Sequence, residues 1–221
     1  VGSDGNFVST ARSWWAVGGA DDGKKTGTGG AAAKLATPAN RKLYTFIGTS
    51  PGAPANLSAQ PLASSNTNIT DTMIGAVDTT ERGQLFRYIR GLDPVLSTER
   101  KAIGDPIHSS PKLATYSCIT PNATDSTKCD KDDQTAFIGT NEGFVQAFNT
   151  DTGEELFAFM PEELIPNIKK LKENTETAAV SNPRPYGMDN PVTLWVNDAN
   201  KDGKVFNTPG ASTPQTGEFV Y

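Results

Sequence analysis

The sequence predicts a mainly β protein built from short strands that pack against similar neighbours. The prediction rests first on residues 134–161, QTAFIGTNEGFVQAFNTDTGEELFAFMP, which read as three short strands at 135–139, 143–148 and 155–159. Asn, Asp and Gly lie between these strands and supply the left-handed backbone conformations of tight hairpin turns. It rests second on the 21 Gly and 15 Pro, which suit a chain dominated by turns. A meander of this size cannot bury its own faces, so we expect stacked or radial neighbours.

Further elements are predicted along the chain. A capping box, Asp78 answered by Glu81, opens an amphipathic helix over 79–90, whose arginines are interpreted as a solvated face. Residues 31–35 favour a helical turn. The remaining predicted elements are strands at 41–48, 112–116 and 192–196, and a helix over 164–171.

Three regions follow from this order. Residues 1–40 are predicted to be a poorly structured lead-in or connection, with Trp14 and Trp15 as anchors. Residues 41–104 hold the first strand and the amphipathic helix, and residues 105–221 hold the meander and a later hairpin.

Composition excludes several classes of function. The 221 residues carry a formal net charge of -5, which argues against a general nucleic-acid binder because phosphate binding needs clustered Lys and Arg. No apolar run approaches the roughly 18 residues of a transmembrane segment. The first residues lack the features of a signal peptide and residues 217–221 read as an interrupted strand, so we expect a piece of a larger protein.

The two cysteines, Cys118 and Cys129, lie in one polar, turn-rich stretch that is predicted to be a loop. A disulfide there would suit an oxidising compartment, and two free thiols are the alternative. A metal pair is not expected, because the chain has no further Cys and its one His, His108, lies elsewhere. His108 next to Ser109 does not predict nucleophilic catalysis, since neighbouring side chains on an extended segment point to opposite faces. We expect His108 to form a structural hydrogen bond with a neighbouring sheet.

The strongest chemical motif is NDANKDGKV at residues 197–205, which matches D-x-N-x-D-G-x-V, the first half of an EF-hand-like calcium loop. Asp198, Asn200 and Asp202, at alternate positions, would place oxygen ligands around one hard cation. Gly203 permits the sharp turn, and the carbonyl of Lys204 can supply the next oxygen.

The match ends after this half. Positions 9 and 12 are Phe206 and Pro209, so the bidentate Glu of a full EF-hand is missing. Remaining ligands would come from water, Asn207 or a distant group such as Glu218. The alternative is an ordinary Asx-rich hairpin turn.

Two resemblances bear on architecture. The spacing of Gly139, Asn141, Gly143, Phe148 and Gly153 resembles the blade repeat of quinoprotein-like β-propellers. The order of motifs from about residue 30 onward resembles the C-terminal domain of the PilC/PilY family of type IV pilus tip-associated proteins; these motifs are GAAAKL at 30–35, RKLYT at 41–45, LFRYIRG at 85–91, GDPIHSSP at 104–111, the blade at 139–159 and YGMD at 186–189.

The second resemblance implies a quinoprotein-like modified β-propeller with short helical insertions, of which 105–221 would supply the first few blades. It implies export to the periplasm, pilus tip or cell surface of a Gram-negative bacterium, with minor pilins and a host-cell receptor as partners. The family's calcium loop carries over onto Asp198, Asn200 and Asp202, with Phe206 where the family generally has another acidic residue.

The expected function is therefore non-enzymatic: a calcium-binding module that supports pilus assembly, twitching motility and adhesion. One alternative is a quinone-dependent dehydrogenase, suggested by the blade repeat alone. Another is a scaffold for envelope assembly, which would not need the calcium loop.

Overall fold

The computed structural model describes residues 2–16, 29–48, 59–101, 103–125, 127–175, 183–206, 214–215 and 219–220. The elements are helices α1 (Gly30–Lys34), α2 (Asp71–Ile74), α3 (Thr79–Ile89) and α4 (Asn167–Glu173), the 3-10 helix η3 (Glu162–Leu164), and strands β1 (Leu43–Tyr44), β2 (Lys112–Pro121), β3 (Cys129–Gly139), β4 (Val145–Asn149), β5 (Glu155–Phe159), β6 (Val196–Asn197) and β7 (Phe219–Val220).

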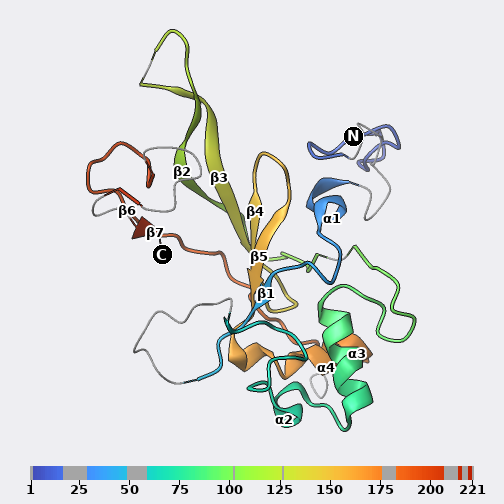
Figure 1. Cartoon of the computed structure of the whole chain (residues 1–221). Helices are drawn as coiled ribbons and strands as arrows, with labels where there is room; N and C mark the ends of the chain where they lie inside the picture. Colours follow the sequence, from blue (N-terminus) through green and yellow to red (C-terminus); the bar gives the residue numbers. More distant parts are fainter. Residues whose placement is uncertain are drawn as a thin grey trace.

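One mixed five-stranded sheet, in the order β1-β5-β4-β3-β2, organises these elements (Figure 1). Strands β2 to β5 form an antiparallel meander, and β1 joins β5 in parallel. The three strands predicted around the meander are confirmed. The sheet is open, and the described residues contain no second sheet of this size, so the propeller inferred from the resemblance is not seen in them.

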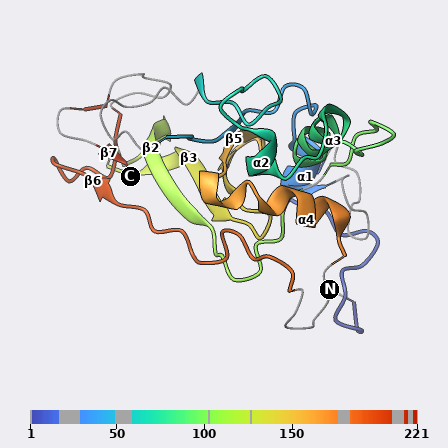
Figure 2. The ribbon, with the colours of Figure 1, turned by 90° about the horizontal axis from the view of Figure 1, so that it is seen from below.

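The main hydrophobic core lies between the β1 end of the sheet and helices α2, α3 and α4, which gather on one side of it (Figure 2). Leu43, Ala158 and Met160 contribute from the sheet end, and Ile89 and Ile168 from the helices. Apolar residues at helical spacing in α3 and α4 produce this packing, as their sequence pattern predicted.

Helix α3 begins as the capping box predicted. The Asp78 side chain accepts a hydrogen bond from the Glu81 amide at 2.7 Å, and Gly91 adopts a φ of 92° just after the helix. The interpretation of its arginines as a solvated face was wrong. Arg90 donates to the carbonyls of Pro38 and Arg41, because its guanidinium lies against the segment that leads into β1.

Strands β2 and β3 are much longer than predicted and extend beyond their neighbours as a two-stranded arm (Figure 1). Part of the stretch expected to be a loop is instead strand, since β2 continues past Cys118 to Pro121 and Cys129 begins β3. Two exposed faces explain the polar composition that suggested a loop, because a strand surrounded by water carries polar side chains on both sides.

The N-terminal segment is attached by one of the two predicted anchors. Trp15 packs on Gly153 in the β4–β5 turn and donates from Nε1 to the Thr150 carbonyl at 3.1 Å. A side chain on Gly153, whose φ is 75°, would collide with the indole ring. Trp14 is 86% exposed and contributes no such anchor. The region boundaries at 40/41 and 104/105 stay predictions.

Residues 183–206 return across the sheet. The amides of Gly187 and Met188 donate to the carbonyls of Asn141 and Thr140 in the β3–β4 turn. The strand predicted at 192–196 is wrong except at its last residue, because β6 comprises only Val196–Asn197 and pairs with β7. Residues 192–194 instead run as irregular chain beside the sheet.

Candidate functional site

The predicted calcium loop lies directly after β6, on the side of the sheet away from the helices (Figure 1). Asn200 and Asp202 are exposed and Asp198 is half-buried, so each can be reached by a dissolved ion. The backbone turns sharply through two left-handed residues, with φ of 60° at Lys201 and 75° at Gly203. The glycine predicted to permit the turn therefore occupies the conformation that requires it.

Side-chain oxygens hold this turn together. The Asp202 amide donates to Asp198 Oδ1 at 3.1 Å and to Asn200 Oδ1 at 2.9 Å. The Gly203 amide donates to Asp198 Oδ2 at 2.8 Å, and the Lys204 amide to Asp202 Oδ1 at 2.9 Å. The structure thus gathers the three predicted ligand side chains around one stretch of backbone.

A residue that sequence reasoning missed, Gln215, joins this group. Its Nε2 donates to Asp202 Oδ2 at 3.3 Å and to the Lys204 carbonyl at 3.2 Å. Its Oε1 accepts from Asn200 Nδ2 at 2.8 Å. One carboxamide therefore bridges three of the predicted ligand residues. Gln215 lies outside the D-x-N-x-D-G motif, so the sequence contains no local signal that would have identified it.

Of the other residues considered for the loop, Phe206 alone is among the described residues. Asn207, Pro209 and Glu218 lie outside the described residues. Phe206, at position 9 of the motif, packs its ring on Tyr116 of β2, with ring centroids 5.8 Å apart. It therefore serves packing against the sheet and not the chemistry of the loop.

The donor set fits a hard cation. Two carboxylates, one amide oxygen and one carbonyl are the oxygen types that Ca²⁺ prefers, and Gln215 can present its Oε1 by rotation of the amide. Lys201 and Lys204 offset the formal charges of Asp198 and Asp202 within the loop. Since ligand charge count sets affinity, a calcium ion held by this loop would be bound at the weak end of the known range.

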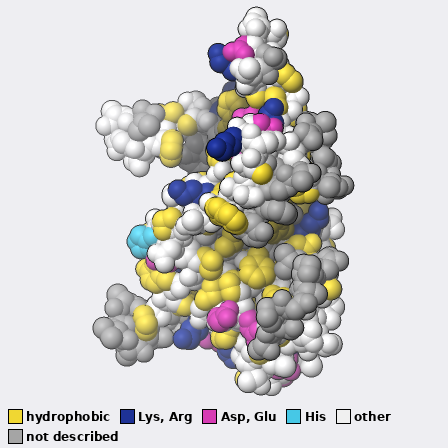
Figure 3. Space-filling model, turned by 90° about the vertical axis from the view of Figure 1, so that its left-hand side faces the viewer, with side chains coloured by type: hydrophobic (Ala, Val, Ile, Leu, Met, Phe, Trp, Pro, Cys, Tyr) yellow, Lys and Arg dark blue, Asp and Glu magenta, His cyan; other side chains and the backbone are white. Residues whose placement is uncertain are grey.

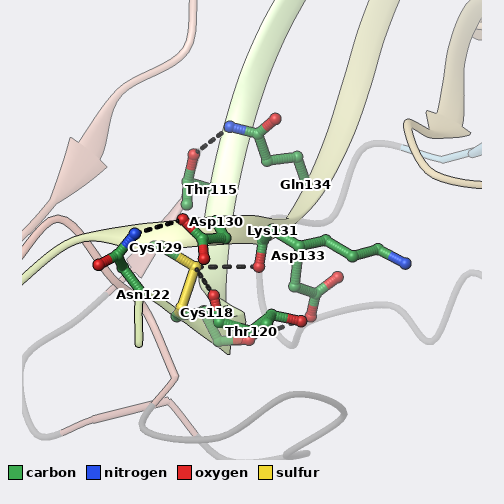
Figure 4. The surroundings of a disulfide bond; sticks show 10 residues. Thr115, Cys118, Thr120, Asn122, Cys129, Asp130, Lys131, Asp133 and Gln134 are labelled. Carbon is green, nitrogen blue, oxygen red and sulfur yellow. Dashed lines mark hydrogen bonds between the residues drawn. A yellow bond between two sulfur atoms is a disulfide. The ribbon is translucent and has the colours of Figure 1, made fainter. Parts of the chain in front are cut away.

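The predicted disulfide joins Cys118 to Cys129 across the arm, with Cα atoms 5.8 Å apart (Figure 4). Both sulfurs are consumed by this bond, so their proximity to Asp132 does not make a metal site. Beside the disulfide, Asn122 Nδ2 donates to Asp130 Oδ1 at 2.8 Å and forms a second link between the two sides of the arm.

His108 and Ser109 have separate structural contacts. His108 Nδ1 lies 2.7 Å from Asp189 Oδ2, and its ring stacks on Tyr186. Ser109 Oγ accepts from the Gly139 amide at 3.0 Å. The histidine thus links the returning segment to the chain that precedes β2, whereas the serine holds the end of β3.

Comparison with known proteins gives one relevant similarity. The chain is 30% identical over 137 residues to the type IV pilus biogenesis factor PilY1 of Pseudomonas aeruginosa (strain UCBPP-PA14). The chain is related in part to PilY1. The match covers 56% of this chain and only 11% of the length of PilY1. No family model and no solved structure matches the chain.

Two structural findings accompany this similarity. The disulfide fits an extracytoplasmic protein, because such bonds persist in oxidising compartments. None of the helices among the described residues is long and apolar enough to cross a membrane.

Proposed function

We propose that this chain is a non-enzymatic, calcium-binding module of the type IV pilus machinery that supports pilus assembly, twitching motility and adhesion. The partial homology to PilY1 carries the proposal. The disulfide-closed arm supports the exported location that this role requires, in the periplasm, at the pilus tip or on the cell surface. Minor pilins are the proposed partners inside the pilus, and a host-cell receptor is the proposed partner outside it.

The finer proposal for the fold is a modified β-propeller. The sheet supports it because β2 to β5 are consecutive antiparallel neighbours, which is the strand order of a propeller blade. The remaining blades would come from the rest of a larger protein, since the chain spans 11% of the length of its relative.

Within this module, Asp198, Asn200, Asp202 and the carbonyl of Lys204 would hold Ca²⁺, with Gln215 as the additional protein ligand. The ion supplies positive charge that several loop oxygens share. The existing turn supports the proposal, because the three side chains already converge through their bonds to the backbone amides of residues 202–204.

Calorimetric titration of Ca²⁺ into chelator-treated protein tests the metal site. Wild type should bind one ion, and Asp198→Ala and Asp202→Ala should each abolish measurable heat. Glu163→Gln is the matched control, because it removes an exposed carboxylate from η3 and should leave binding unchanged. Binding that survives both aspartate substitutions would move the site elsewhere, and absence of binding by wild type would refute the calcium proposal.

A cellular experiment tests the pilus role separately. Deletion of the protein in its own bacterium should abolish surface pili and twitching, and the wild-type protein should restore both. Normal piliation after deletion would contradict the proposal irrespective of the calorimetric result.

A further inference from the structure

Two residues connect the candidate calcium loop to the sheet. Val205, immediately after the loop, is 2% exposed, and Phe206 packs on Tyr116 of β2. The amides of Val205 and Phe206 both donate to the Tyr116 carbonyl, at 2.9 and 2.7 Å. We call Val205–Phe206 the latch.

The latch lies over an apolar groove of about 540 Å³. The groove is lined from the sheet by Tyr116, Phe137, Val145 and Phe157, which come from four adjacent strands and share one face. Hydrophobic side chains gather in the middle of the side of the molecule that carries β6 (Figure 3). The helices pack against the opposite face near β1, and on this face the latch lines the groove together with residues 192–194 and Pro214.

The attachment of the latch to β2 is narrow. Both hydrogen bonds that the latch amides donate end on the single carbonyl of Tyr116, and β2 is the edge strand of the sheet. Its position is therefore sensitive to the direction in which the chain leaves the loop at Lys204. That direction is set by the same turn that the side chains of Asp198 and Asp202 fix.

We propose that ion binding at residues 198–204 fastens the latch onto Tyr116, and that ion release frees the latch and uncovers the groove and the adjoining edge of β2. This inference rests on the proposed calcium site and adds its regulation. The coupling is reciprocal. An interaction that stabilises the closed latch raises the affinity of the loop for the ion, and a molecule that displaces the latch from Tyr116 lowers that affinity by the factor by which the ion weakens the molecule's own binding.

Hydrogen exchange and hydroxyl-radical labelling of the whole chain test the coupling. If latch opening expels the ion, exchange of the Val205 and Phe206 amides should slow about 100-fold at free Ca²⁺ of about 100 times Kd. Tyr116 belongs to β2 and not to the loop, so its labelling reports whether the latch covers it. Labelling of Tyr116 should fall when Ca²⁺ is added.

Variants separate this inference from the metal site. Phe206→Ala should still bind Ca²⁺ in calorimetry, with a weaker Kd, but should lose the protection of Tyr116. Phe206→Leu should restore part of it, and Phe7→Ala, which truncates an aromatic ring that is 67% exposed, should behave as wild type.

The outcomes are distinguishable. Absence of binding by wild type would refute the calcium site and with it this inference. Binding by wild type without protection of Tyr116 would overturn the coupling and leave the calcium site standing. Equal protection of Tyr116 in wild type and Phe206→Ala would also overturn it.

Discussion

Replacement of Glu155 by alanine should cost about 3–5 kcal/mol of unfolding free energy, because it leaves a buried guanidinium without its partner. Arg41 Nε and Nη2 donate to the two carboxylate oxygens of Glu155 at 2.8 and 2.7 Å. The side chains are only 4% and 1% exposed. Glu155 also accepts from Gln146 Nε2 at 2.7 Å, so its loss leaves two donors in the interior unpaired.

The magnitude is large against the 5–15 kcal/mol that typically stabilises a domain. Urea denaturation followed by circular dichroism measures it, with Glu154→Ala as the matched control at the exposed neighbouring position, expected within about 0.5 kcal/mol of wild type. The double variant Arg41→Met with Glu155→Met should be far closer to wild type than either single variant, since no charge is then left buried. A loss below about 1 kcal/mol for Glu155→Ala would refute this account of the ion pair.

Three further predictions concern the arm and the loop. Replacing Cys118 and Cys129 together by serine should cost about 3 kcal/mol in urea denaturation, as loss of an 11-residue closure predicts, and reduction of wild type should reproduce that loss; an unchanged midpoint would contradict it. Burial raises the pKa of Tyr116 above its ordinary value of 10.0, so the contribution of the neutral phenol to the free energy of unfolding is present below pH 10 and is lost as pH rises through the folded pKa. Tyr116→Phe should flatten this alkaline decline in stability. An identical decline in the variant would exclude Tyr116 as its source. Lys201→Asn should tighten Ca²⁺ binding roughly three- to tenfold in calorimetry by removing a positive charge beside the ligands, and Asn tolerates the φ of 60°; an unchanged Kd would show that the charge acts too weakly to matter.

The elements with local signals were predictable from the sequence. The capping box at Asp78 located the start of α3, and turn residues such as Gly153 located the hairpin between β4 and β5. In each case the residue type needed at the turn or cap differs from its surroundings, so the signal survives without knowledge of the tertiary contacts.

Elements that depend on distant partners were not predictable in the same way. The arm of β2 and β3 is held by a ladder between two polar segments, and polar composition is also what a loop shows. Residues 192–194 have strand-like composition, but they pack beside the sheet without joining it. Propensity reports preference for a half-buried surface, and only the neighbouring strand decides whether a ladder forms.

The candidate site likewise contains residues with a local sequence signal and one residue without it. Local spacing identified Asp198, Asn200 and Asp202, because alternate ligands on a tight turn leave a pattern in the sequence. Gln215 reaches the same loop from outside the motif, where no local pattern marks it.

The two faces of the sheet differ in how they are held, and this difference locates the part of the molecule suited to regulation. On one face, Leu43 and Ala158 are buried against helices in a continuous core, which opens only at the cost of many apolar contacts. On the other face, the latch meets β2 through one carbonyl and one aromatic pair. A bound ion changes an equilibrium only where the alternative state is close in free energy. The proposed coupling places this alternative state at the latch and not at the helical core, so we expect an ion bound at residues 198–204 to act on the groove face.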